Sequence, residues 1–226
     1  MRLKDHSANA ITLLNAIFGF LGCIALTQSR FDLALAALIF AAIADFLDGF
    51  VARILKVNSV YGNFLDSMAD LVSFGVLPSL WWYFALSTLS QPLSIILSLL
   101  LFVGALLRLV RFSVYPSSTN HFEGLPSPAM ALFVVLITRT DLFADMSYFT
   151  PMWFKRAVVV LSLFFTLWMV SKLPTVSMKF KGFGFKENRL RYLVILSALI
   201  GLFILREAFV LLLLPAYAIL SLLIKR

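Results

Sequence analysis

Long uncharged stretches, each close to the length of a membrane-spanning helix, recur along the whole chain. About 20 apolar residues in an α-helix cross the hydrocarbon layer of a bilayer. Of the 226 residues, 62% are hydrophobic and 13% are charged, so the polar side chains are too few to cover a water-soluble protein of this size. The sequence therefore predicts an all-α, polytopic integral membrane protein.

About eight membrane-spanning helices are expected from the positions of these stretches. Their expected ranges are 8–27, 33–55, 63–88, 92–113, 126–145, 154–173, 191–206 and 207–224. We expect one domain over residues 1–226, with a core over 8–173 and two further C-terminal helices over 191–224. The single cysteine, Cys23, excludes an intrachain disulfide and a metal site built on paired cysteines.

The basic residues favour one orientation of these helices. The formal charge is +8, and fourteen of the 19 lysines and arginines fall on the side that holds both termini when the spans alternate in direction. An excess of Lys and Arg marks the cytoplasmic side of a membrane protein. We therefore expect the cell (inner) membrane, both termini in the cytoplasm, an active site facing the cytoplasm and no nucleic-acid partner. Segment 172–191 is expected to be a cytoplasmic linker within reach of anionic headgroups.

Four aspartates interrupt the apolar background, two at the end of the second expected helix and two in the third. An ionised side chain inside a membrane helix is costly and is usually functional. Helical spacing places Asp45 and Asp48 on one face of their helix, and Asp66 and Asp70 one turn apart on the next. Both pairs can therefore point into one cleft.

Four carboxylates in one cleft would repel one another unless cations were present. All-oxygen ligation suits a hard divalent ion, and four aspartates can hold two ions for a phosphoryl-type displacement. The sequence therefore predicts a site for Mg²⁺ or Mn²⁺ on Asp45, Asp48, Asp66 and Asp70.

The residues around the aspartates fit a phosphate-containing ligand. Gly49 and Ala52 lack bulk, so a ligand can approach the helix, and Arg53 offers a guanidinium fork for phosphate oxygens. Gly62 gives the turn between the two helices conformational freedom. A lone aspartate at a helix end is often a solvated cap, but four at this spacing indicate a metal-dependent site.

The run from Asp45 to Asp70 reads D-x2-D-G-x2-A-R-x8-G-x3-D-x3-D and resembles the signature of the CDP-alcohol phosphotransferase family. The resemblance implies six core helices, a binuclear metal site, a homodimer, and release of CMP when an alcohol attacks the β-phosphate of a CDP-linked lipid. It also implies that Asp70 serves as the catalytic base. The expected CDP-lipid-binding residues are Asn9, Thr12, Asn15, Asp45, Asp48, Gly49, Ala52, Arg53, Ser59 and Gly62.

Two further segments resemble the phosphatidylserine synthase branch of that family. They are Thr12-Leu-Leu-Asn15-Ala-Ile-Phe-Gly19-Phe, and Arg108-Leu-Val-Arg111-Phe followed by Glu123-Gly-Leu-Pro126-Ser-Pro128-Ala. This resemblance implies transfer of a phosphatidyl group from CDP-diacylglycerol or a similar lipid to L-serine. The serine carboxylate needs a cation, and Arg108 and Arg111 share one helix face, so they are the candidate acceptor-binding residues. Both could instead anchor the helix at the membrane interface.

Two other functions stay open on the sequence. The same chemistry on glycerol phosphate, inositol or another alcohol would keep the aspartates and change the acceptor pocket. A proton or cation transporter also uses intramembrane carboxylates, but the gathering of all four at one membrane face counts against it, as does the lack of paired broken helices. The sequence is equally consistent with Mg²⁺ and Mn²⁺, and with ester-linked and ether-linked lipid chains.

Overall fold

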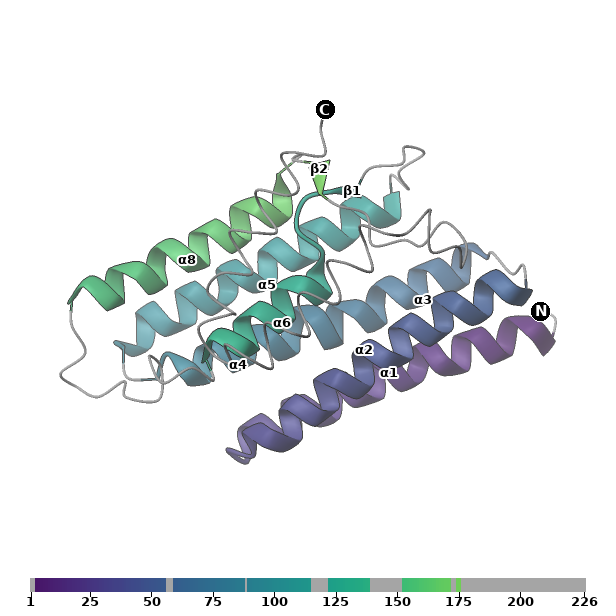
Figure 1. Cartoon of the computed structure of the whole chain (residues 1–226), viewed down its shortest axis with the longest axis horizontal. Helices are drawn as coiled ribbons and strands as arrows, with labels where there is room; N and C mark the ends of the chain where they lie inside the picture. The colour runs from purple at the N-terminus through teal and green to yellow at the C-terminus, as the bar shows by residue number, and fades with distance from the viewer. Residues whose placement is uncertain are drawn as a thin grey trace, which may run out of the picture.

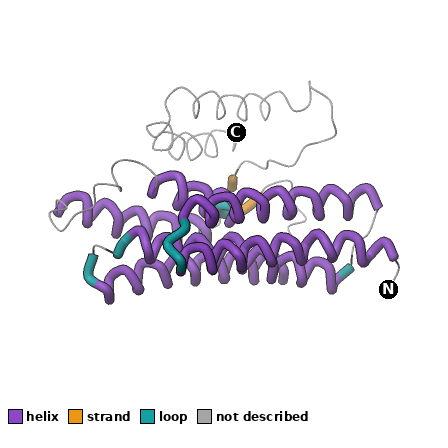
Figure 2. Tube along the Cα trace, turned by 90° about the horizontal axis from the view of Figure 1, so that it is seen from below, coloured by secondary structure: helices purple, strands orange, loops and turns teal. Residues whose placement is uncertain are grey.

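The computed structural model is a layered bundle of helices that run side by side along the long axis of the molecule (Figures 1 and 2). It describes residues 3–55, 59–87, 89–114, 122–138, 152–171 and 174–175. Helix α1 (Leu3–Thr27) packs along α2 (Phe31–Leu55), and α5 (Gln91–Val114) packs along α8 (Met152–Val170). Between these pairs lie α6 (Ser127–Thr138) and one continuous helical path from Val60 to Ala85.

The helices confirm the predicted all-α class, and their bounds lie within a few residues of the expected ones where both are described. The third expected helix, 63–88, is built from α3 (Val60–Asp70), a π-helical segment η1 (Leu71–Val76) and α4 (Leu77–Ala85). The described chain also has two short strands, β1 (Phe122–Glu123) and β2 (Pro174–Thr175), which pair antiparallel. The expected spans 191–206 and 207–224, and residues 139–145 of the fifth span, lie outside the described residues.

Three described helices are long and apolar enough to cross a membrane: Asn9–Thr27, Phe31–Leu55 and Gln91–Val114. Their outward faces carry large apolar side chains, among them Phe20 and Phe46, each with more than half of its surface exposed. An apolar outer surface is stable in lipid and costly in water. These observations fit a membrane protein, and the number of spans in the whole chain stays a prediction.

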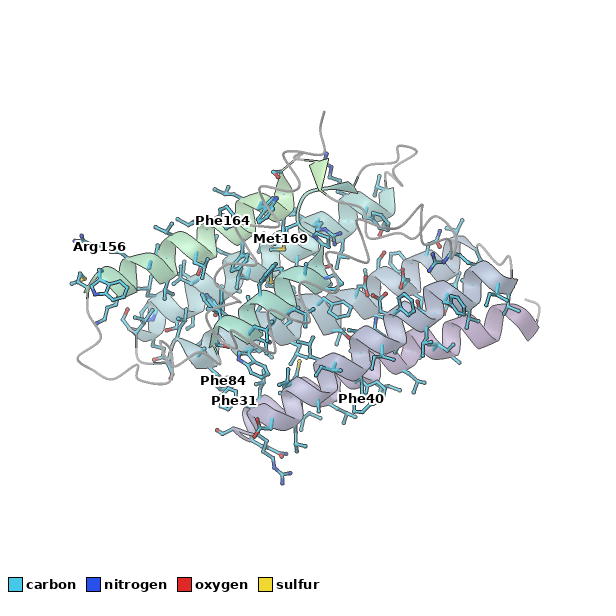
Figure 3. The ribbon with its side chains drawn as sticks, in the orientation of Figure 1. Phe31, Phe40, Phe84, Arg156, Phe164 and Met169 are labelled. Carbon is cyan, nitrogen blue, oxygen red and sulfur yellow. The ribbon has the colours of Figure 1, made fainter. Side chains whose placement is uncertain are left out.

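Two clusters of buried apolar side chains hold the layers together. The first joins α4, α5, α6 and α8 and includes Trp82 and Phe165, and the second joins α1, α2, η1, α4 and α6 and includes Phe74 and Trp81. Within the first cluster, the indole of Trp82 donates a 2.9 Å hydrogen bond to the hydroxyl of Ser162. Figure 3 shows how side chains such as Met169 on α8 fill the space between the helices.

The π-helical segment η1 begins at the residue after Asp70. The backbone N–H of Leu77 donates to the carbonyl of Val72, five residues earlier, as in a π-helix. Pro78 follows, and a proline inside a helix lacks the N–H for the next bond, while its ring crowds the carbonyl four residues back. The wider turn at η1 therefore accommodates Pro78 without breaking the path between α3 and α4.

Candidate active site

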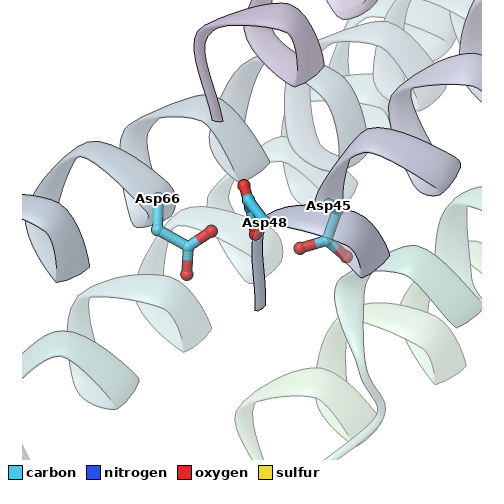
Figure 4. Close-up of side chains that lie close together, drawn as sticks. All are labelled: Asp45, Asp48 and Asp66. Atoms are coloured by element: carbon cyan, nitrogen blue, oxygen red, sulfur yellow. The ribbon is translucent and has the colours of Figure 1, made fainter. Parts of the chain in front are cut away.

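Three of the four predicted aspartates form one group at the junction of α2 and α3. Asp45 and Asp48 lie one turn apart near the end of α2, and Asp66 lies on α3. One carboxylate oxygen from each lies within 4.8 Å of the others (Figure 4). Asp48 is buried, and the other two are half-buried. The helical spacing in the sequence therefore predicted this group correctly.

The oxygens of this group fit a hard divalent cation. Asp48 Oδ2 and Asp66 Oδ1 are both buried and have no hydrogen-bond partner among the residues that the structure describes. A buried carboxylate oxygen without a donor or a counter-ion carries a large free-energy cost. Carboxylate oxygens at this spacing are the ligands that Mg²⁺ and Mn²⁺ prefer, and a cation among them would satisfy both orphaned oxygens.

Asp70 lies one helical turn beyond Asp66, at the end of α3. Its Oδ1 accepts a 3.2 Å hydrogen bond from Nδ2 of Asn15 on α1. It remains close enough to Asp45 and Asp66 for their charges to act on it. The structure thus brings all four aspartates into one neighbourhood, with Asp70 turned toward α1.

Helix α1 supplies polar side chains to both pairs of aspartates. Thr12 hydrogen-bonds the Asp48 side chain, and Asn15 contacts Asp70. Both α1 residues are buried, Asn15 completely. These contacts between helices were not predicted, because Thr12 and Asn15 were expected to bind the CDP-lipid. That role stays a prediction.

Gly49 leaves room beside the aspartates on α2. A Cβ added to Gly49 on α2 would meet no atom within 4 Å, so space is open there. The side chain of Arg53 lies back along α2, where its Nε donates to the Gly49 carbonyl at 2.8 Å. Ala52, in the same turn, is half-buried. Gly49 and Arg53 therefore border an open surface next to the carboxylates, as a phosphate site requires.

Three more of the predicted CDP-lipid-binding residues lie close together where the start of α3 meets α1. Ser59 caps α3, because its hydroxyl accepts a 2.9 Å hydrogen bond from the backbone N–H of Gly62. A Cβ at Gly62 would lie 2.9 Å from Ser59 Oγ and 3.4 Å from Asn9 Oδ1. The absent side chain of Gly62 thus allows α1 and the cap of α3 to meet.

The two predicted acceptor-binding arginines differ in their surroundings. Arg108 on α5 donates from its guanidinium to the Ser127 hydroxyl at 2.8 Å, and its charge acts on Asp70. Arg111 donates to the backbone carbonyl of Val170 on α8 at 3.4 Å. Arg108 therefore lies close enough to Asp70 for its charge to act on that carboxylate.

Three serines that contact this region, Ser67, Ser113 and Ser127, were not among the predicted site residues. The hydroxyl of Ser113 on α5 lies 2.7 Å from the hydroxyl of Ser67, the residue that follows Asp66 on α3. Ser127, the partner of Arg108, begins α6. Serines carry no distinctive pattern in an apolar helix, so their proximity to the site follows only from how α3, α5 and α6 pack.

Comparison with known proteins gives the same protein family that the aspartate motif resembles. The family model for CDP-alcohol phosphatidyltransferase matches residues 5–168, which is most of the chain. The chain belongs to this family. The matched range includes all four aspartates, both arginines and every described helix except the first two residues of α1 and the last two of α8.

Individual members of the family give more detail on what the chain is similar to. The chain is 33% identical over 135 residues to a CDP-diacylglycerol–serine O-phosphatidyltransferase of Helicobacter pylori, covering 59% of this chain and 57% of that protein. It is 37% identical over 145 residues to a protein of the same name from Mycobacterium leprae, covering 58% and 48%. It is also 30% identical over 141 residues to an archaetidylserine synthase of Methanothermobacter thermautotrophicus, covering 61% and 59%. The chain thus matches about half the length of these relatives.

Proposed function

We propose that this protein transfers a phosphatidyl group from CDP-diacylglycerol, or a similar CDP-lipid, to L-serine and releases CMP. The observation that carries the proposal is the group of three carboxylates on α2 and α3, in a chain of the CDP-alcohol phosphatidyltransferase family. Two of their buried oxygens have no partner within the described part of the chain. The names of the relatives support serine as the acceptor.

The reaction requires one bond to phosphorus to form as another breaks. The serine hydroxyl oxygen attacks the β-phosphorus of the donor, the bond between that phosphorus and the bridging oxygen breaks, and CMP leaves with the bridging oxygen. Divalent ions held by the converging carboxylates of Asp45, Asp48 and Asp66 would neutralise the phosphate charge as it develops on CMP. Arg53 and Gly49 face the donor phosphates, because the guanidinium binds their oxygens and the missing side chain lets them approach.

The proton of the serine hydroxyl needs an acceptor, and Asp70 is the proposed one. A carboxylate next to the reacting phosphate can take a proton directly from an attacking alcohol. Arg108 lies close enough to Asp70 for its charge to act on that carboxylate. A guanidinium there would bind the serine carboxylate and hold the hydroxyl toward Asp70.

Glycerol phosphate and inositol are the alternative acceptors, and purified protein with CDP-diacylglycerol, Mn²⁺ and each alcohol distinguishes them. We expect serine to give the fastest CMP release. Arg108→Ala is then expected to raise the KM for serine by roughly tenfold or more, the value of a charge-assisted hydrogen bond, with little change in the KM for the CDP-lipid. Arg111→Ala is the matched comparison and is expected to have the smaller effect, because Arg108 is the arginine whose charge acts on Asp70, the proposed proton acceptor. Equal effects of Arg108→Ala on both substrates, or faster release with another alcohol, would contradict serine binding at Arg108.

The proposed location is the cell (inner) membrane, with the site open to the cytoplasm. The aspartates lie at the end of α2 near Leu55, and the loop between α1 and α2, with Arg30, lies at the other end. In a Cys23→Ser background, a cysteine at Asn58 should be shielded from an impermeant thiol reagent in intact cells, and a cysteine at Arg30 should react. Rapid labelling at Asn58 with none at Arg30 would mean that the opposite topology is correct.

A further inference from the structure

Asn15 links the aspartate cluster to the π-helical segment that follows it. Its side chain donates to Asp70 Oδ1 at 3.2 Å, while its backbone carbonyl accepts a 2.8 Å hydrogen bond from the Ser73 hydroxyl. Asn15 and Ser73 are both completely buried. The two bonds therefore tie one residue of α1 to Asp70 on α3 and to η1.

The backbone geometry makes this link close and rigid. Gly19 lies one turn after Asn15 on α1, and a Cβ added there would lie 2.7 Å from the Cα of Ser73. No side chain fits at that distance without moving a backbone, so the backbones of α1 and η1 are in close contact at Gly19. Ser73, which makes this contact, lies in the π-helical segment η1, whose wider turn accommodates Pro78.

The Asn15 amide fixes the orientation of one carboxylate oxygen of Asp70. Asp45, Asp48 and Asp66 converge within 4.8 Å, whereas the Asp70 carboxylate is held toward α1 by this amide. With one oxygen bonded, rotation of the carboxylate is restricted and the second oxygen keeps a defined direction. A base that accepts a proton in the transition state must be held in this way, because small displacements of a catalytic group cost large factors in rate.

We propose that Asn15 and Ser73 are positioning residues for Asp70: Ser73 holds the α1 backbone at Asn15, and Asn15 holds the carboxylate that accepts the hydroxyl proton. The inference rests on the proposed role of Asp70 as that proton acceptor. It assigns to Asn15 a task different from binding the CDP-lipid, and it gives the π-helical turn a function in catalysis.

A double-mutant cycle between Asn15→Leu and Asp70→Asn tests the proposal. Asn15→Leu keeps the side-chain size close to that of asparagine and removes the donor. If Asn15 acts through Asp70, the single substitution lowers kcat by roughly tenfold or more, as the loss of a charge-assisted hydrogen bond predicts. In the Asp70→Asn background the same substitution should then cost almost nothing further.

Binding measurements separate positioning from a general structural role. Mn²⁺ affinity, measured by electron paramagnetic resonance, and the KM for the CDP-lipid should stay within about twofold of wild type in Asn15→Leu, because the three-carboxylate group is intact. Ser73→Ala should also lower kcat, but by less than Asn15→Leu does. Ser98→Ala is the matched control, since it removes another buried hydroxyl that donates to a backbone carbonyl, within its own helix, and it should leave kcat unchanged.

The outcomes distinguish this inference from the proposed function. Additive losses in the cycle, or a parallel fall in Mn²⁺ affinity and kcat in Asn15→Leu, would overturn the positioning role while wild type remains active. If wild type releases CMP only with an alcohol other than serine, the proposed acceptor is wrong, and the cycle run with that alcohol still decides the role of Asn15. A wild type that releases no CMP with any alcohol overturns the proposed function, and the positioning role with it.

Discussion

Replacement of Asp66 by alanine is expected to abolish CMP release and to weaken Mn²⁺ binding. The substitution removes one of the three carboxylates that converge within 4.8 Å and leaves the pair on α2 without its partner on α3. We expect the rate to fall by at least the roughly 10²–10³-fold that the loss of one preorganised electrostatic group costs. The measurements are CMP release and a Mn²⁺ titration followed by electron paramagnetic resonance on the same purified protein.

Asp32→Ala provides the control for this experiment. Asp32 is an exposed aspartate in the first turn of α2, at the end away from Asp45 and Asp48. Its removal takes the same charge from the protein without touching the cluster, so activity and Mn²⁺ affinity should stay near those of wild type. An Asp66→Ala protein that keeps wild-type activity and metal affinity would show that the three-carboxylate group is not the metal site.

Asp70→Asn is expected to lower kcat by at least roughly 10²-fold, the usual loss when acid–base help is removed. Asparagine keeps the shape of the side chain and an oxygen that can accept from Asn15, but it cannot take a proton at neutral pH. CDP-lipid binding and Mn²⁺ affinity should therefore survive. The rate is measured under saturating serine and CDP-lipid, and binding is measured separately.

Asp45→Asn is the matched comparison, because it makes the same chemical change inside the three-carboxylate group. It should weaken Mn²⁺ binding, whereas Asp70→Asn should not. If Asp70→Asn loses metal and donor binding together, ligation is the main role of Asp70. Turnover of serine near the wild-type rate in Asp70→Asn would mean that another group takes the proton.

The pairing of the aspartates on each helix was predictable because it depends on local spacing. Asp45 and Asp48 are three residues apart, and Asp66 and Asp70 are four apart, so each pair shares a helix face whatever the rest of the chain does. The apolar stretches likewise fixed the positions of α1, α2 and α5 to within a few residues, since only long helices satisfy the backbone hydrogen bonds of a chain in lipid.

The contacts between helices were not predictable in the same way. The Asn15 amide reaches Asp70 because of the rotation and depth at which α1 packs on α3, and neither is encoded in a short pattern. The π-helical segment was not predicted because residues 71–76 are apolar or small, as in any membrane helix. The available signal was Pro78, because a proline removes one backbone hydrogen bond of an α-helix. The spacing of Thr12, Asn15 and Gly19 along one face of α1 was the available clue to a polar, close-packed helix contact.

Metal-dependent release of CMP from CDP-diacylglycerol by the purified protein tests the central claim most directly. With serine and Mn²⁺ or Mg²⁺ present, CMP should accumulate together with the serine-linked lipid. Excess EDTA should stop the reaction, and added Mn²⁺ should restore it, because the buried oxygens of Asp48 and Asp66 need a cation to hold the donor phosphates. Full CMP release in excess EDTA, or no release with metal, serine and donor all present, would contradict the account.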